Sequence, residues 1–290
     1  MKVVGRTLSL ERGEYLSENT FRAAADLRAR LMHHSGQCLV RVPPPILYNM
    51  ERNGKKLTSI TFTGIDDRTD IGRIQEIQDK YPYVEWGVLM SYHWYKNGHR
   101  FMSPKYLDKL WHKGLRLSAH LCGQMAVDVL DAETDTMHAT IGYRFDLFKR
   151  CQLNVVASRH FRQLRTMRVF DRQLDEVILQ MQTPSTLDSF LKYVEEPTRH
   201  VSYLIDGSGG RGIDCPIKVF DKPDIHVGYA GGIGPDNVRE KLKMLFEYPS
   251  CGEFWIDMES RVRDEEDWLD LDKVEQVLVI CDPIIREYKT

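Results

Sequence analysis

The chain has 290 residues, of which 42% are hydrophobic and 28% are charged, as in an ordinary globular protein. Its 40 basic and 42 acidic side chains leave a formal net charge of −2, which argues against a nucleic-acid coat. No apolar run approaches the ~20 residues that cross a bilayer, and the first residues lack the apolar core of a secretory signal. Six scattered cysteines without CxxC pairs are typical of a reduced compartment. We therefore expect a cytoplasmic protein without a membrane or nucleic-acid partner.

Residues 1–56 differ in pattern from the rest of the chain. Ser17 to Thr20 can cap a helix that carries Phe21, Leu27 and Leu31 on one face, and a proline run at 43–45 follows. We expect a helical N-terminal extension that packs on the following domain. The alternative is a separate interaction module.

Residues 57–290 repeat one pattern eight times. Short apolar, β-branched or aromatic runs begin 24 to 37 residues apart, which leaves room for a loop and a helix after each run. The predicted strands are 57–63, 84–90, 115–120, 152–157, 176–181, 201–205, 225–230 and 253–257.

Helix starts are indicated between several of these strands. Pro104, Pro184 and Pro235 each follow a residue that can precede a helix. Strands that alternate with helices imply parallel pairing, and eight such units match the ~250 residues of a (β/α)₈ TIM barrel. A doubly wound sheet would call for a glycine-rich turn after the first strand, which reads Thr63–Gly64–Ile65 instead. The predicted fold class is therefore α/β, a TIM barrel over 57–290.

In such a barrel the site lies at the carboxyl ends of the strands. After the seventh strand the sequence runs Gly231–Gly232–Ile233–Gly234 into a helix that is predicted to begin at Pro235, with Asn237 in its N-terminal end. Glycine amides and a helix N-terminus together favour a phosphate. The alternative is a tight turn and helix cap that needs no ligand.

A second candidate follows the sixth strand. Asp206 ends that strand, and a glycine-rich loop with Gly209 and Gly210 comes directly after it. This arrangement favours a general acid or base with a mobile lid. The alternative is an aspartate that caps the loop by accepting backbone hydrogen bonds.

His120 and Cys122 lie at the end of the third strand. A cysteine that faces the barrel mouth next to a histidine can act as a nucleophile or base, although buried cysteines are commonly inert. No further histidine or cysteine stands at ligand spacing, so we expect neither a metal nor another cofactor.

Three stretches, LIDGSGGRGID, GYAGGIGPDNV and FWIDMESRV, resemble the phosphoribosylanthranilate isomerase family in the same order. Weaker likeness in ITFTGIDD, HRFMSP and CQLNV extends the resemblance over 57–290. It implies a (β/α)₈ barrel that catalyses an Amadori rearrangement, the opening of an aminoribose ring to an enol-ketose. It also implies that Asp206 is the general acid and that Arg100 holds an anionic group. Gly231 and Gly232 would bind phosphate, and Asp257 would assist catalysis.

The sequence departs from the family at three places, one of which is Asn154–Val155, where the family has a histidine-glycine pair. Thr63 stands where the family has its base, a cysteine, and a threonine hydroxyl is no base near pH 7 without a strong activator. In the second phosphate loop Glu259–Ser260–Arg261 replaces Ser-Ser-Gly; Arg261 can bind phosphate or obstruct the site.

The sequence thus predicts a divergent isomerase-like enzyme that moves a proton on a small phosphorylated sugar-type ligand. The predicted catalytic residues are Thr63, His120, Cys122, Asp206 and Asp257. The predicted binding residues are Arg100, Gly209, Gly210, Gly231, Gly232, Asn237, Ser260 and Arg261. The alternative is a non-catalytic binding or interaction protein on a degenerate barrel.

Overall fold

The computed structural model describes residues 51–52, 55–93, 96, 98–110, 113–131, 136, 147–155, 175–193, 201–248 and 252–287. The side chains of residues 51–56 and of Tyr193 lie outside this description. Most of the predicted N-terminal extension, residues 1–50 and 53–54, falls outside the described residues. Its predicted helix stays a prediction.

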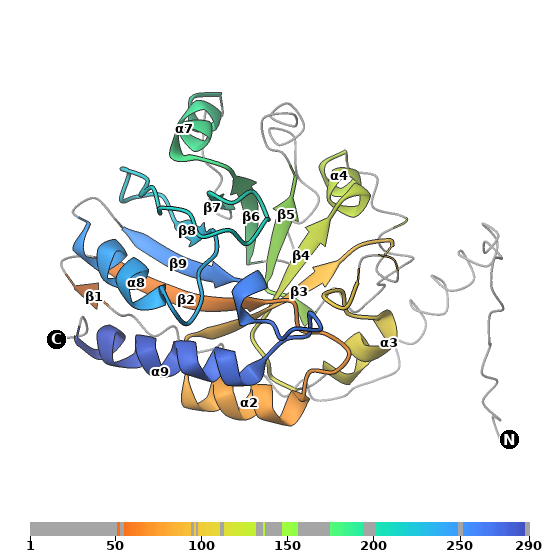
Figure 1. Cartoon of the computed structure of the whole chain (residues 1–290). Helices are drawn as coiled ribbons and strands as arrows, with labels where there is room; N and C mark the ends of the chain where they lie inside the picture. The colour runs from red at the N-terminus through yellow and green to blue at the C-terminus, as the bar shows by residue number, and fades with distance from the viewer. Residues whose placement is uncertain are drawn as a thin grey trace, which may run out of the picture. The chain divides into compact units, whose positions relative to one another are not determined.

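Eight parallel strands close into a barrel (Figure 1). Each strand pairs with the next along the chain, and β9 pairs back with β2. A short strand β1 (Glu51–Arg52) adds to β2 in the antiparallel sense. The barrel strands are β2 (Lys55–Thr63), β3 (Val84–Met90), β4 (Leu117–Cys122), β5 (Arg150–Asn154), β6 (Glu176–Met181), β7 (Val201–Asp206), β8 (Val227–Ala230) and β9 (Glu253–Met258).

Helices follow the strands and cover the outside of the barrel. Arg73 of the first helix pairs with Asp272 and Glu275 of the last, so these two lie side by side (Figure 1). The described helices are α2 (Ile71–Lys80), α3 (Pro104–Leu107), α4 (Gln124–Leu130), α7 (Pro184–Tyr193), α8 (Val238–Glu247) and α9 (Leu271–Glu287), with 3₁₀ turns η2 (Asp108–Leu110) and η4 (Ser260–Val262).

All eight predicted strands are confirmed, with ends that differ by a few residues. Two predicted helix starts are confirmed in atomic detail: Ser103 Oγ accepts from Tyr106 N at 3.2 Å, and Thr183 Oγ1 accepts from Thr186 N at 3.1 Å. The third differs, because α8 begins at Val238 rather than at Pro235. Residues 235–237 form a turn that precedes the helix.

The large apolar core lies between the strands and the helices. It includes Phe62, Val88 and Leu121 from the strands and Leu242 and Val277 from the helices. Inside the barrel the described apolar residues form a separate small cluster of Ile178, Leu204 and Trp255.

The rest of the barrel interior is strongly polar, whereas branched apolar residues fill the usual barrel of this type. Side chains alternate between the two faces of a strand, so Arg150, Gln152 and Asn154 of β5 share the inner face. Arg150 Nη1 donates to Glu85 Oε1 at 2.8 Å, and its Nε pairs with Glu176. These charges lie deeper in the barrel than the mouth.

No helix among the described residues is both long and apolar enough to span a membrane.

Candidate functional site

A cavity of about 330 Å³ opens among the carboxyl ends of the strands. Ten of the residues predicted as catalytic or binding line it: Thr63, His120, Cys122, Asp206, Gly209, Gly210, Gly231, Gly232, Asp257 and Ser260. Three others, Arg100, Asn237 and Arg261, are not among the lining residues. The prediction that a barrel site gathers strand-end residues therefore matches this cavity, although the chemical role of each residue stays a prediction.

Asp206 has its carboxylate fixed by four donors. Ser208 N and Ser208 Oγ donate to Oδ1 at 2.9 and 2.7 Å. Gly210 N and Gln180 Nε2 donate to Oδ2 at 2.5 and 3.1 Å. Four donors match the acceptor capacity of an ionised carboxylate. Asp206 thus makes the loop-capping bonds considered as one alternative, and it does so while lining the cavity.

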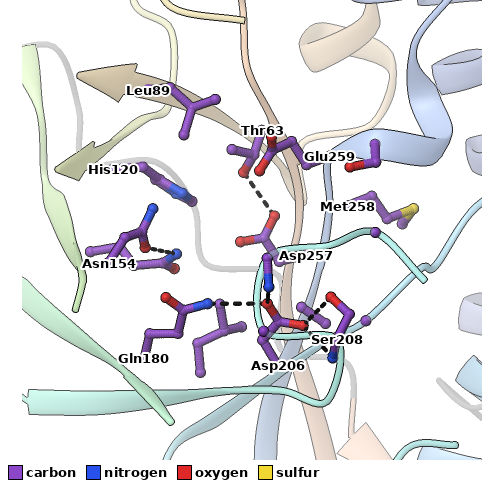
Figure 2. Close-up of a pocket in the computed structure, with 18 of the residues that line it drawn as sticks. Thr63, Leu89, His120, Asn154, Gln180, Asp206, Ser208, Asp257, Met258 and Glu259 are labelled. Carbon is purple, nitrogen blue, oxygen red and sulfur yellow. Dashed lines mark hydrogen bonds between the residues drawn. The ribbon is translucent and has the colours of Figure 1, made fainter. Parts of the chain in front are cut away.

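Asp257 lies next to Asp206 in the cavity but in a different environment (Figure 2). Its Oδ1 accepts from Thr63 Oγ1 at 2.7 Å. Burial raises the pKa of Asp257 well above its ordinary value, and the charges of Glu259, Glu85 and Asp206 raise it further against the hydrogen bond from Thr63. This carboxyl group is therefore suited to hold a proton near neutral pH.

A glycine on the neighbouring strand leaves the space that the side chain of Thr63 occupies. β2 pairs Thr63 in register with Gly87 of β3. A Cβ at Gly87 would lie 2.5 Å from Thr63 Oγ1, so any larger residue would displace the threonine that contacts Asp257.

Cys122 faces the cavity as a thiol. Its Sγ accepts from Asn154 Nδ2 at 3.2 Å and donates to the backbone oxygen of His120 at 3.6 Å. Burial raises the pKa of Cys122 to about 12, which disfavours the thiolate that a nucleophile or base requires. The contact with His120 is to its main chain, so the structure gives no pairing of the thiol with the imidazole.

His120 is 1% exposed and lines the cavity. Its ring points toward Asp257 across the mouth (Figure 2). Burial lowers the pKa of His120 to about 3, and the charge of Arg150 adds to this effect. The imidazole is therefore neutral at physiological pH.

Arg100 is held by protein carboxylates at the rim of the barrel. Its Nε donates to both carboxylate oxygens of Asp267, at 2.9 and 2.8 Å. Its Nη1 donates to Glu259 Oε1 at 2.7 Å and to Ser260 Oγ at 2.9 Å. A ligand anion at Arg100 would have to compete with these partners.

The glycine turn after β8 makes close contacts with the loop after β7. Gly232 has φ +63°, and a Cβ there would lie 2.4 Å from Asp214 N. Asn237 Oδ1 accepts from Gly234 N at 2.9 Å, so this amide is already used within the turn. Arg261 pairs with Asp236 beside the turn. The turn therefore has the internal contacts of a cap, and it also lines the cavity.

Sequence reasoning missed one amide that lines the cavity, that of Gln152 on β5. Gln180 at the end of β6 also lines the cavity, and it holds Asp206. The alternation of Arg150, Gln152 and Asn154 could have indicated Gln152, because the residues at every second position of a strand share a face.

No protein-family model matches the chain, and no curated protein matches it. Several solved structures match the chain. It resembles phosphoribosyl anthranilate isomerase from Thermus thermophilus with a TM-score of 0.51 and 16% sequence identity. The match covers 78% of this chain and 99% of that isomerase. It is similar to N-(5'-phosphoribosyl)anthranilate isomerase from Pyrococcus furiosus with a TM-score of 0.48 and 14% identity, over 78% and 98%. The chain is thus a (β/α)₈ barrel. In particular, it has the fold of the isomerase from Thermus thermophilus, and the predicted resemblance is confirmed for the fold.

Proposed function

We propose that the chain is an isomerase-like enzyme that transfers protons on a small phosphorylated sugar-type ligand bound at the barrel mouth. The observation that carries this proposal is the pair Asp206 and Asp257, two carboxyl groups in one cavity with opposite environments. Asp206 is surrounded by donors, whereas Asp257 is buried with one donor. Environments that separate two carboxyl groups in this way assign an acid and a base.

The reaction class is an aldose-to-ketose rearrangement of the Amadori type. Asp257 donates its proton to the ring oxygen of the sugar, and the bond from that oxygen to C1 breaks. The resemblance implies that Asp206 is the general acid, but the four donors around its carboxylate and the raised pKa of Asp257 favour the opposite roles. Asp206 accepts the proton from C2, and the electron pair of that C–H bond forms the C1–C2 double bond of an enol, which tautomerises to the ketose. Thr63 positions Asp257 and does not itself act as a base.

We place the anionic end of the ligand at the Gly231–Gly232 turn. The turn lines the cavity and leads to the N-terminus of α8, where the partial positive charge of the helix favours phosphate. Among the described residues that line the cavity, the acidic side chains are Asp206, Asp257 and Glu259, and none is lysine or arginine. Binding of phosphate at this turn would therefore depend on main-chain amides.

The test is turnover of a panel of phosphorylated aldoses and aldosylamines by the wild type, Asp206→Asn and the exposed control Asp224→Asn. We expect turnover of at least one substrate, a loss of about 10²–10⁴-fold in Asp206→Asn, and an unchanged rate in the control. Equal rates in the two variants would remove Asp206 from the mechanism.

The second candidate is a binding protein without catalysis. The observations in its favour are the Cys122 thiol and the engagement of Arg100 by Asp267 and Glu259. A ligand that raises the unfolding midpoint and is recovered unchanged, with no turnover of any panel member, would favour this candidate.

A further inference from the structure

Two side chains that line the mouth cavity from β4 and β5 each carry a buried polar atom without a hydrogen-bond partner among the described residues. The two atoms are Nε2 of His120 and Oε1 of Gln152. The two residues are 1% and 3% exposed, and they are paired in register across the two strands. Because an unpartnered buried polar atom is costly, this neighbouring pair is suited to a polar group that a ligand brings.

The orientation of Gln152 is fixed by its neighbours. Its Nε2 donates to Asn154 Oδ1 at 2.8 Å, and Asn154 Nδ2 in turn donates to Cys122 Sγ at 3.2 Å. Oε1 is therefore the atom of Gln152 that is left for a ligand. Since an amide oxygen only accepts, the ligand group must be able to donate.

The surroundings of this pair disfavour two kinds of group. An ammonium is disfavoured because Arg150, whose charge acts on His120, lies two residues before Gln152, at the next inward-facing position of β5. A carboxylate is disfavoured because it only accepts hydrogen bonds, and Gln152 Oε1 offers no proton. A hydroxyl group both donates and accepts, so it satisfies Gln152 and either tautomer of a neutral His120.

The subsite lies across the barrel from the glycine turn. In the closed strand order, β4 and β5 stand opposite β8 and β9. Gly231–Gly232 follow the end of β8, and Asp257 lies on β9. A ligand anchored at the turn therefore extends toward His120, whose ring points into the mouth in Figure 2.

We propose that His120 and Gln152 form a subsite for a hydroxyl group at the uncharged end of the ligand, opposite the Gly231–Gly232 turn. The inference rests on the proposed function for the position of the ligand. It narrows the ligand class to a polyhydroxylated sugar whose far end is uncharged and hydrogen-bonding.

The test uses two pairs of probes and calorimetric titration of the full chain. The pairs are D-ribose 5-phosphate with 2-deoxy-D-ribose 5-phosphate, and D-ribose with 2-deoxy-D-ribose. We expect each hydroxylated probe to bind about tenfold or more tightly than its deoxy partner. His120→Phe and Gln152→Leu are each expected to reduce that preference to about twofold or less.

Ser118→Ala is the matched control: Ser118 Oγ, also on β4, is buried and has no hydrogen-bond partner in the described part of the chain, but Ser118 does not line the cavity. It should keep the preference. Unfolding midpoints of all variants check that they fold. If one variant does not fold, the ratio of the affinities of the wild type for the hydroxylated and the deoxy probe still tests the proposal.

The proposal is overturned by equal affinities within both pairs in the wild type, by a preference that survives in both variants, or by no binding of any probe. The ratio of the affinities within a probe pair tests the hydroxyl subsite. The ratio of the affinities of the phosphorylated and unphosphorylated probes tests the anion site of the proposed function, and turnover tests the proposed reaction. The two proposals can therefore fail separately.

Discussion

Two polar layers inside the barrel differ in how their charges are paired. In the lower layer, Arg150 pairs with Glu85 and Glu176, and His226 Nδ1 lies 2.7 Å from Glu176 Oε1. In the mouth layer, Asp257 has a threonine as its hydrogen-bond partner. The lower layer thus pairs its charges with one another, whereas the described partner of Asp257 is a neutral hydroxyl group, in the layer where the proposed function places the ligand.

Two buried carboxyl groups make the contrast explicit. Burial acts to raise the pKa of Glu176, but the charge of Arg150 and the hydrogen bond from His226 outweigh it and hold the pKa below its ordinary value. Burial raises the pKa of Asp257, and the nearby charges of Glu259, Glu85 and Asp206 increase the shift. Burial thus acts in the same direction on both carboxyl groups, and the charges around each one set the opposite directions of the two pKa shifts.

Breaking the lower layer should have the largest effect. Arg150→Met leaves Glu85 and Glu176 without their main cation, and the loss of one partner from a buried ion pair costs about 3–5 kcal/mol. We expect a fall of that size in the free energy of unfolding, measured by urea denaturation. The control Arg286→Met, at an exposed pair with Asp282, should change the unfolding midpoint little. Similar midpoints for both variants would contradict a structural role for the lower layer.

Asp257→Asn tests the difference between the two carboxyl groups through the pH dependence of stability. Because the pKa of Asp257 is raised in the folded state, the native protein binds a proton that the unfolded chain, with an ordinary pKa of about 3.9, has lost. Wild-type stability should therefore fall as pH rises from about 4, whereas asparagine removes this slope. Unfolding midpoints at pH 4 and pH 8 measure the effect. The midpoint of the variant, relative to that of the wild type, should be higher at pH 8 than at pH 4. Parallel midpoints at both pH values would show that Asp257 ionises normally.

Arg100→Met tests whether the rim arginine is structural. Its loss leaves Asp267 and Glu259 without their common donor, and we expect about 1–2 kcal/mol of destabilisation because the group is partly exposed. Binding of D-ribose 5-phosphate should be nearly unchanged. An unchanged unfolding midpoint together with weaker binding would instead make Arg100 a ligand-binding residue.

Cys122→Ser should have the smallest effect. With its pKa raised to about 12, the thiol contributes almost no thiolate at pH 7. We expect turnover within about twofold of the wild type and slow alkylation of Cys122 by iodoacetamide at pH 7, followed by mass spectrometry. Rapid alkylation that abolishes turnover would restore Cys122 as a catalytic candidate.

The fold was predictable because its signal is local and repeated. Each strand is a short apolar run, and helix starts at Ser103 and Thr183 follow from side chains that cap their own backbone. The eightfold alternation then implies a barrel without any knowledge of distant contacts.

The site was predictable in position but less so in its contacts. Strand ends identified Asp206 and Asp257, since the barrel gathers these ends at one mouth. The partners of Arg100 could not be predicted, because Asp267 is 167 positions away and reaches Arg100 only after the barrel closes. The raised pKa of Asp257 likewise depends on burial, which a local pattern does not reveal.

The most direct measurement of the central claim is exchange of the C2 hydrogen of D-ribose 5-phosphate in D₂O, followed by proton NMR. Transfer between a carboxylate and C2 must replace that hydrogen with deuterium, since the base exchanges its proton with solvent. We predict exchange with the wild type and its loss in both Asp206→Asn and Asp257→Asn. Absence of exchange in the wild type, or exchange at the wild-type rate in either variant, would contradict the assignment of this pair as the proton-transfer groups.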